Sequence, residues 1–245
     1  MSQHSDDKHA DDQHSGPQRP DAEEVRPDDD LSPQVAACVR AVEDLFHPLL
    51  GTLRESGEAL APLFDAPVDA ARVLTASRPH ALTVLADPHT VGAGFVVSPG
   101  ILTDETYLLA WWQGDDQGLI PDSIALVQST DYSRQEWFRT PQRTHTSHVT
   151  GPYIDYVCTD EFMLTSTVQV ERDGRMLVVM GADVLAETVE RTLLEVFRAA
   201  DATLVNDHDR VVLSSHVHLF AGEPVDRDDF TTQVPCPGLP FSVLA

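Results

Sequence analysis

The apolar positions of residues 33–55 recur every three or four residues, which is the spacing of a helix that buries one face. Ser32 is a favoured N-cap residue and Pro33 suits the first helical position, so the helix is expected to begin there. Its apolar stripe consists of Val35, Val39, Val42, Phe46, Leu49, Leu50 and Leu53. Two shorter helical pieces, 57–64 and 68–76, are expected to follow. We expect the stripe to pack in the core, and a homodimer through this helix is the alternative.

From His80 onward the apolar residues alternate in short runs separated by turn-forming residues, which is typical of β-strands. Four such runs are predicted to be strands, namely residues 81–86, 91–98, 106–113 and 124–129. Two further runs, 162–170 and 175–184, predict a hairpin, because the E-R-D-G-R between them contains a glycine that accepts the positive φ of a tight turn.

The remaining pattern predicts a helix over residues 185–199 and a second hairpin, built from 202–205 and 210–215 around N-D-H-D. From Leu219 to the end the chain is rich in Pro and Asp and is expected to be irregular. Parallel α/β folds alternate strand and helix throughout, and this chain does not. We therefore expect an α+β fold in which a long N-terminal helix packs on a central antiparallel sheet.

Composition and pattern together divide the chain into four segments. Residues 1–30 carry ten acidic and three basic side chains and almost nothing apolar, so they cannot bury enough surface to offset the entropy of ordering. We expect a disordered acidic tail there, a helical region over 31–79, a sheet domain over 80–218 and an irregular C-terminal segment over 219–245.

The net charge of −24 disfavours nucleic acids and anionic membranes as partners, since both require clustered Lys and Arg. No run of about 18 apolar residues predicts a membrane span, and the first residues lack the features of a secretory signal, so a cytoplasmic location is expected. The three cysteines are far apart and predict neither disulfides nor a zinc site: Cys38, Cys158 and Cys236.

Common catalytic motifs, such as G-x-S-x-G, the phosphate-binding G-x-x-x-x-G-K-[ST] and H-E-x-x-H, are absent, so no enzyme activity, catalytic residue or cofactor is predicted. His145 and His148 are expected in a Thr/Ser-rich loop and His216 and His218 on an exposed strand edge, with no third ligand to complete a metal site. The glycines of V-G-A-G-F at 91–95 lie within a predicted strand, where they would let another backbone or a ligand approach closely.

Residues 131–183 place a loop rich in aromatic and charged side chains directly before the first hairpin, which is the layout of a ligand pocket on a sheet. Three motifs in this stretch resemble those of Cache (PDC) sensor domains: D-Y-S-R-Q-E-W-F at 131–138, G-P-Y-I-D at 151–155 and V-V-M-G-A-D-V at 178–184. In element order the resemblance covers residues 33–217. It implies an extended PAS-like fold whose central antiparallel sheet holds a small-molecule pocket on one face.

In the amino-acid-binding branch of that family, an Arg two residues before Trp-Tyr grips the ligand carboxylate, and an Asp ending a glycine-containing strand receives the ammonium. Trp137 and Asp183 match this pattern, and Phe138 stands where Tyr is usual. Gln135 stands where the Arg is expected, with Arg134 one position early. Without a correctly aimed guanidinium the bidentate carboxylate contact is lost.

The predicted ligand-binding residues are Tyr132, Arg134, Gln135, Trp137, Phe138, Tyr153, Asp155 and Asp183. Carboxylates beside aromatic walls suit an ammonium group. The alternatives are a carboxylate ligand held by Arg134, Arg139 or Arg143, or a structural role in which Asp183 caps the next helix and the aromatic residues belong to the core.

We therefore expect a non-enzymatic, cytosolic, stand-alone sensor of an amine or amino-acid-like compound. Its signal would leave through a regulatory protein partner or through dimerisation. An enzyme using Asp183, Asp155 or His145 as acid–base groups in the same pocket is the second hypothesis, and a scaffolding dimer with a vestigial pocket is the third.

Overall fold

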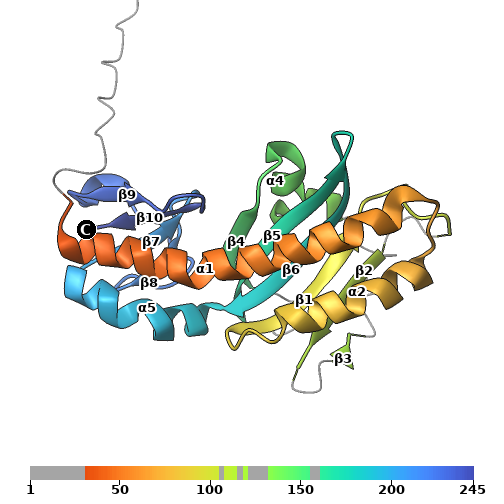
Figure 1. Cartoon of the computed structure of the whole chain (residues 1–245). Coiled ribbons are helices and arrows are strands. Elements are labelled where there is room, and N and C mark those ends of the chain that lie inside the picture. The colour runs from red at the N-terminus through yellow and green to blue at the C-terminus, as the bar shows by residue number, and fades with distance from the viewer. Residues whose placement is uncertain (1–30, 105–107, 115–117, 121–131, 155–160) are drawn as a thin grey trace, which may run out of the picture. The chain divides into compact units, whose positions relative to one another are not determined.

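The computed structural model describes residues 31–104, 108–114, 118–120, 132–154 and 161–245, which form two antiparallel sheets joined by a long helix (Figure 1). The helices are α1 (Pro33–Leu60), α2 (Ala70–Val84), α4 (Glu136–Thr144) and α5 (Ala186–Ala200), with 3₁₀ turns η1 (Ala61–Asp65), η2 (Tyr132–Arg134) and η3 (Arg227–Asp229).

The larger sheet has six strands in the order β3-β2-β1-β6-β5-β4. Their bounds are β1 Thr90–Val97, β2 Leu108–Gln113, β3 Gly118–Leu119, β4 His148–Ile154, β5 Phe162–Arg172 and β6 Arg175–Leu185. The smaller sheet has the order β8-β7-β10-β9, with β7 Thr203–Asn206, β8 Val211–Ser214, β9 Gln233–Pro235 and β10 Phe241–Leu244. These sheets and the long first helix confirm the expected α+β fold.

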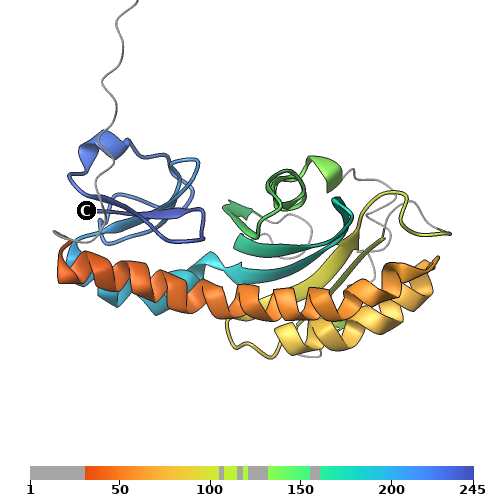
Figure 2. The same ribbon diagram turned by 45° about the horizontal axis from the view of Figure 1, so that its top comes forward.

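Helix α1 is unbroken over 28 residues and runs beneath both sheets (Figure 2). Ser32 caps it as predicted, with its hydroxyl oxygen accepting a hydrogen bond from the Val35 amide at 3.2 Å. All seven residues of the predicted apolar stripe are buried, so the stripe packs in the core of the chain itself. The predicted separate piece 57–64 is instead the end of α1 followed by η1.

Helix α2 corrects the prediction of a strand at residues 81–86. Asp69 caps the helix through a 2.8 Å bond from the Arg72 amide, and the helix continues past Pro79 to Val84. Its buried residues recur at helical spacing: Val73, Ser77, Ala81 and Val84. Burial of this face against the sheet outweighs the helix-breaking tendency of proline.

Of the other strands predicted for the larger sheet, four are confirmed and one lies outside the described residues. Strands β1 and β2 confirm the runs at 91–98 and 106–113, while the strand predicted at 124–129 lies outside the described residues. Strands β5 and β6 confirm the hairpin. At its turn Asp173 and Gly174 both have positive φ, 51° and 73°, which is the conformation of a tight two-residue hairpin.

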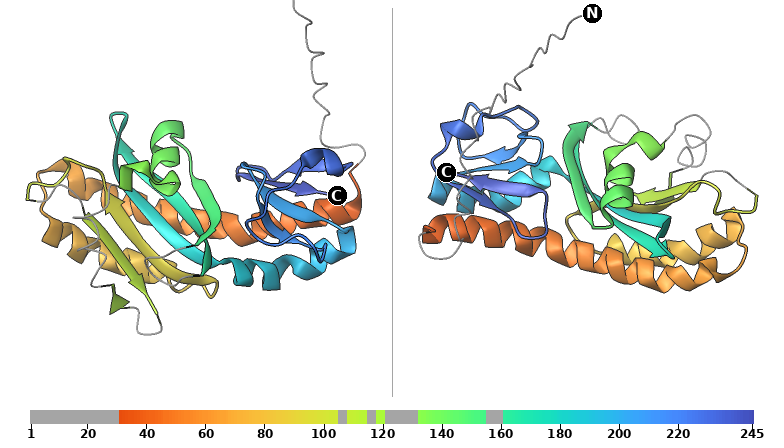
Figure 3. Two further views of the ribbon diagram at one scale, coloured as in Figure 1. Left: turned by 180° about the vertical axis from the view of Figure 1, so that it is seen from behind. Right: turned by 90° about the horizontal axis from the view of Figure 1, so that it is seen from above.

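The smaller sheet corrects the expectation that residues 219–245 are irregular. The hairpin of β7 and β8 is present as predicted, but β10 pairs with β7 and β9 pairs with β10 (Figure 3). These two strands are only three and four residues long and stand among prolines, so they carry little local signal.

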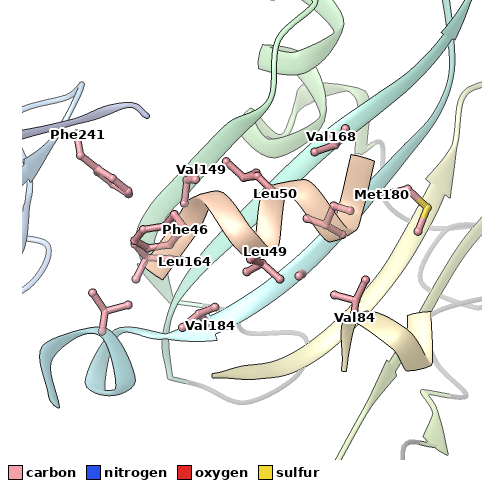
Figure 4. Packing of buried hydrophobic residues seen from close by; sticks show 14 of the residues in the cluster. Phe46, Leu49, Leu50, Val84, Val149, Leu164, Val168, Met180, Val184 and Phe241 are labelled. Carbon is pink, nitrogen blue, oxygen red and sulfur yellow. The ribbon is translucent and has the colours of Figure 1, made fainter. Parts of the chain in front are cut away.

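One apolar cluster connects the two sheets through α1 (Figure 4). Phe46 of α1 lies with its ring centroid 5.2 Å from that of Phe241 in β10, and the same cluster contains Val149 and Leu164 of the larger sheet. None of the helices in the described part of the chain combines the length and apolarity that crossing a membrane requires.

Candidate functional site

The face of the larger sheet opposite α1 and α2 carries a second, smaller apolar cluster beneath helix α4. Tyr132 and Phe138 are buried there against Val96, Leu109, Met176 and Val179. Trp137 packs on the edge of this cluster, with its ring centroid 5.7 Å from that of Tyr132. Three of the predicted ligand-binding aromatics therefore help to hold α4 on the sheet.

The stretch predicted as a loop at 131–138 is helical in its described part. Gln135 occupies the N-cap position of α4 with extended backbone angles, and Glu136 follows in the first turn, where a negative charge favours the helix dipole. Arg134 and Gln135, which the sequence placed in the pocket, are exposed at this helix start. Asp155 lies outside the described residues.

Asp183 lies on the same face of the sheet in β6, with only 5% of its surface exposed. Its Oδ1 accepts a 2.6 Å hydrogen bond from the hydroxyl of Thr165, which stands directly opposite in β5. The Tyr153 hydroxyl lies 2.6 Å from the same Thr165 oxygen. Because Thr165 has one proton and gives it to Asp183, Tyr153 donates, and a hydrogen-bonded chain runs from β4 to β6.

This arrangement excludes the helix-capping role considered for Asp183. Helix α5 begins at Ala186, its N-cap position is Leu185, and no side chain caps it. The structure instead brings Tyr153 and Asp183 together through Thr165, a residue that none of the sequence motifs singled out.

Glycines on β1 and β6 make room for Trp111 of β2 beside this carboxylate. A Cβ atom at Gly94 would lie 2.6 Å from the indole ring, and one at Gly181 would lie 2.9 Å from it. A Cβ atom at Gly92 would lie 2.5 Å from Trp111 Nε1 and 3.3 Å from Asp183 Oδ2. A close approach of another backbone or a ligand was expected at Gly92 and Gly94. At Gly94 the backbone carbonyl oxygen of Ala110 is nearest, 2.0 Å from such a Cβ, and at both glycines the side chain of Trp111, which sequence reasoning overlooked, also lies close.

A polar cluster links α4 to β4 and to the β7–β8 turn. His148, predicted to lie in a loop, is a buried residue of β4, and its Nε2 lies 2.9 Å from Oε1 of Glu136. That hydrogen bond lowers the pKa of Glu136, partly opposed by burial. Among the described residues, Glu136, Asp207 and His208 bring metal-ligand atoms within 4.8 Å of one another, but Asp207 and His208 are exposed. The contacts of Glu136 with His148 and of Asp207 with His208 already pair these side chains with one another, so their proximity does not require a bound metal.

A separate groove of about 750 Å³ lies between the larger sheet and the β9–β10 loop. It is lined by residues of α1 and β5, by residues 145–148 just after α4 and by residues 238–240, including Arg54, Glu58, His145, Glu171 and Leu239. His145 is engaged there, with Nδ1 2.7 Å from Oε1 of Glu171. His216 and His218 lie in the turn after β8 and not on a strand.

Comparisons with known proteins agree with the fold. Residues 83–191 match the model of the first PDC sensor domain of methyl-accepting chemotaxis protein-like proteins. No curated protein matches the chain in sequence.

Solved structures share the fold at low sequence identity. The ligand-binding domain of the Campylobacter jejuni chemoreceptor Tlp3, in complex with L-norvaline, aligns with a TM-score of 0.56 and 15% identity over 80% of this chain and 71% of that one. The ligand-binding domain of the Pseudomonas fluorescens chemoreceptor CtaA, in complex with L-isoleucine, aligns with a TM-score of 0.58 and 14% identity over 85% and 86%. Residues 83–191 are thus similar to a PDC (Cache) sensor domain, and the chain shares the fold of chemoreceptor ligand-binding domains.

Proposed function

We propose that this protein is a small-molecule sensor whose ligand is an amine or amino-acid-like compound, with its ammonium group bound by Asp183. The observation that carries the proposal is a buried carboxylate that Thr165 and Tyr153 hold in a fixed orientation on the sheet face. An ammonium group gives such a carboxylate charge-assisted hydrogen bonds, which are stronger than neutral ones.

The orientation of the carboxylate supports this assignment. Thr165 occupies Oδ1, and Oδ2 lies toward Gly92 and the indole of Trp111. An aromatic wall beside a carboxylate favours a cation, because the ring face is electron-rich. The chemoreceptor domains of similar fold were solved with L-norvaline and L-isoleucine, both of which carry an ammonium group.

A ligand bound chiefly through its carboxylate is less well supported. That alternative depends on Arg134, Arg139 or Arg143, and all three side chains are exposed. A sensor of this kind passes its signal to a partner or to a second copy of itself, and the burial of the α1 stripe leaves only the polar face of that helix for such contacts.

The test is a thermal-shift screen of amines, amino acids and carboxylates, since a ligand that binds only the native state raises the melting temperature. We expect amines or amino acids to raise it, and Asp183→Asn to weaken their binding about 10- to 100-fold through loss of a charged hydrogen bond. Asn can still accept the Thr165 hydrogen bond, so the variant should fold.

Asp173→Asn is the matched control, because Asp173 is exposed in the β5–β6 turn and Asn tolerates its positive φ. Its binding should equal that of the wild type. The proposal fails if no amine or amino acid raises the melting temperature. It also fails if Asp183→Asn binds the amines or amino acids as tightly as the wild type does.

A further inference from the structure

The indole nitrogen of Trp111 is a buried donor without a hydrogen-bond partner among the described residues. Only 9% of the residue is exposed. Buried donors are nearly always paired, because an unpaired one loses its bond to water and gains nothing in return. An unpaired donor on the sheet face that carries Asp183 is a candidate contact for a bound ligand.

The position of this donor relative to Asp183 is narrowly defined. The two distances measured from a Cβ at Gly92, 2.5 Å to Trp111 Nε1 and 3.3 Å to Asp183 Oδ2, set an upper limit on the separation of those atoms. Their sum is close to two hydrogen-bond lengths of about 2.9 Å. If a ligand's ammonium nitrogen binds Asp183, the ligand atoms next to that nitrogen can therefore lie within hydrogen-bond distance of Trp111 Nε1.

A second unpaired polar atom borders the same site. Thr150 in β4 stands directly opposite Thr165, so the two side chains share a face of the sheet. The Thr150 hydroxyl is buried and has no partner in the described part of the chain. Unpaired groups thus lie on both sides of the hydrogen-bonded chain of Tyr153, Thr165 and Asp183.

An ammonium group alone does not satisfy the indole. Ammonium carries donors and no acceptor, and the indole N–H is also a donor only, so the two cannot bond to each other. A ligand that satisfies both must present an acceptor oxygen next to its ammonium group. The carboxylate of an α-amino acid is such an acceptor.

On the basis of the proposed function, we propose that the Trp111 N–H binds an oxygen adjacent to the ligand ammonium, so that the site selects α-amino acids over simple alkylamines. Trp111 is in this respect a specificity-determining residue. It provides one neutral donor near the carboxylate end of the ligand in a chain that has Gln135 where the related amino-acid-binding domains have the arginine clamp.

The test compares L-norvaline with butylamine, the amine that remains when its carboxylate is removed, by isothermal titration calorimetry. The wild-type protein should bind L-norvaline at least about tenfold more tightly. Trp111→Phe keeps an aromatic ring over the glycines, although a smaller one, and removes the donor, so it should lower L-norvaline affinity about tenfold and leave butylamine affinity unchanged. Trp112→Phe is the control, since Trp112 packs on the opposite face beside Phe95, and it should leave the ratio of the two affinities unchanged.

A second measurement does not depend on the variant's stability. In wild-type protein with ¹⁵N-labelled tryptophan, the indole N–H resonance of Trp111 should shift with L-norvaline and not with butylamine, while those of Trp112 and Trp137 stay in place. Equal binding of the two probes through Asp183, or an unmoved Trp111 resonance, overturns this inference and leaves the sensor proposal intact. Failure of every amine and amino acid to bind overturns both.

Discussion

Replacement of Phe46 by alanine tests whether the two sheets form one cooperative unit. The side chain is fully buried in α1, and Figure 4 shows it between Phe241 of β10 and residues Val149 and Leu164 of the larger sheet. The apolar cluster that contains it includes residues of both sheets. Removing this ring therefore opens a cavity at the point where the two sheets share their core.

The expected loss of stability follows from two terms. Burying a phenylalanine side chain contributes about 1.5–3 kcal/mol, and the cavity left behind raises the cost of Phe→Ala in a core to about 3–5 kcal/mol. We expect the upper part of that range, because the neighbours come from a long helix and two hydrogen-bonded sheets that cannot easily collapse into the space. A domain is typically stable by about 5–15 kcal/mol, so the change removes a large share.

Urea denaturation with two probes measures this effect. All three tryptophans belong to the larger sheet or to α4, so their fluorescence reports on that part of the fold: Trp111, Trp112 and Trp137. Far-UV circular dichroism reports on both sheets and all helices. If the core is shared, the two probes give the same midpoint, and Phe46→Ala lowers both midpoints equally with an unchanged slope.

The matched control is Phe220→Ala, the same chemical change at a side chain that is 64% exposed, for which a change within about 0.5 kcal/mol is expected. The reasoning is refuted if Phe46→Ala leaves the fluorescence midpoint unchanged while circular dichroism shows an earlier loss of structure. That result would mean that the smaller sheet unfolds by itself.

Three further predictions follow from single contacts. Gly94→Ala places a methyl group 2.0 Å from a carbonyl oxygen of the facing strand, so it should lower stability by about 3 kcal/mol or more in thermal denaturation. Burial raises the pKa of Cys38 to about 11 and that of Cys236 to about 12, so neither thiol should be alkylated by iodoacetamide at pH 8, as mapped by mass spectrometry, until the protein unfolds. The His148 hydrogen bond lowers the pKa of Glu136, so Glu136→Gln should destabilise the protein above pH 4.5 and by progressively less as the pH falls below that value; an unchanged difference at pH 3 would contradict the assignment.

The parts of the fold that sequence reasoning predicted are those encoded by neighbours in the chain. The period of α1 and the turn of the β5–β6 hairpin are local signals, and both are confirmed. Residues 81–84 are helical, where a strand was predicted, because their burial against the sheet, a tertiary effect, decides the outcome. The strands β9 and β10 are too short to show an alternating pattern in the sequence, and β10 is defined by its pairing with β7.

The candidate site shows the same limit. Asp183 emerged from a resemblance of motifs, but its partner Thr165 depends on the register of β5 against β6, and the place of Trp111 depends on the register of β2 against β1. Neither relationship is visible before the strands are aligned. Phe138 was selected because it stands where the motif has a tyrosine, and its burial in the cluster beneath α4 depends on contacts with β1, β2 and β6 that the motif does not contain.

The glycines of the sheet give the strongest reason to regard this face as a built site. Gly92, Gly94 and Gly181 lie in strands β1 and β6 at the centre of the larger sheet, where a glycine costs stability relative to a residue with a side chain. Alanine at any of the three would contact the indole of Trp111 at less than 3.0 Å. The sheet therefore gives up side-chain packing at three positions to lay one tryptophan flat beside Asp183. A core that needed only to be filled would use β-branched residues at these positions, whereas a site that needs a donor and a carboxylate in fixed register requires the glycines.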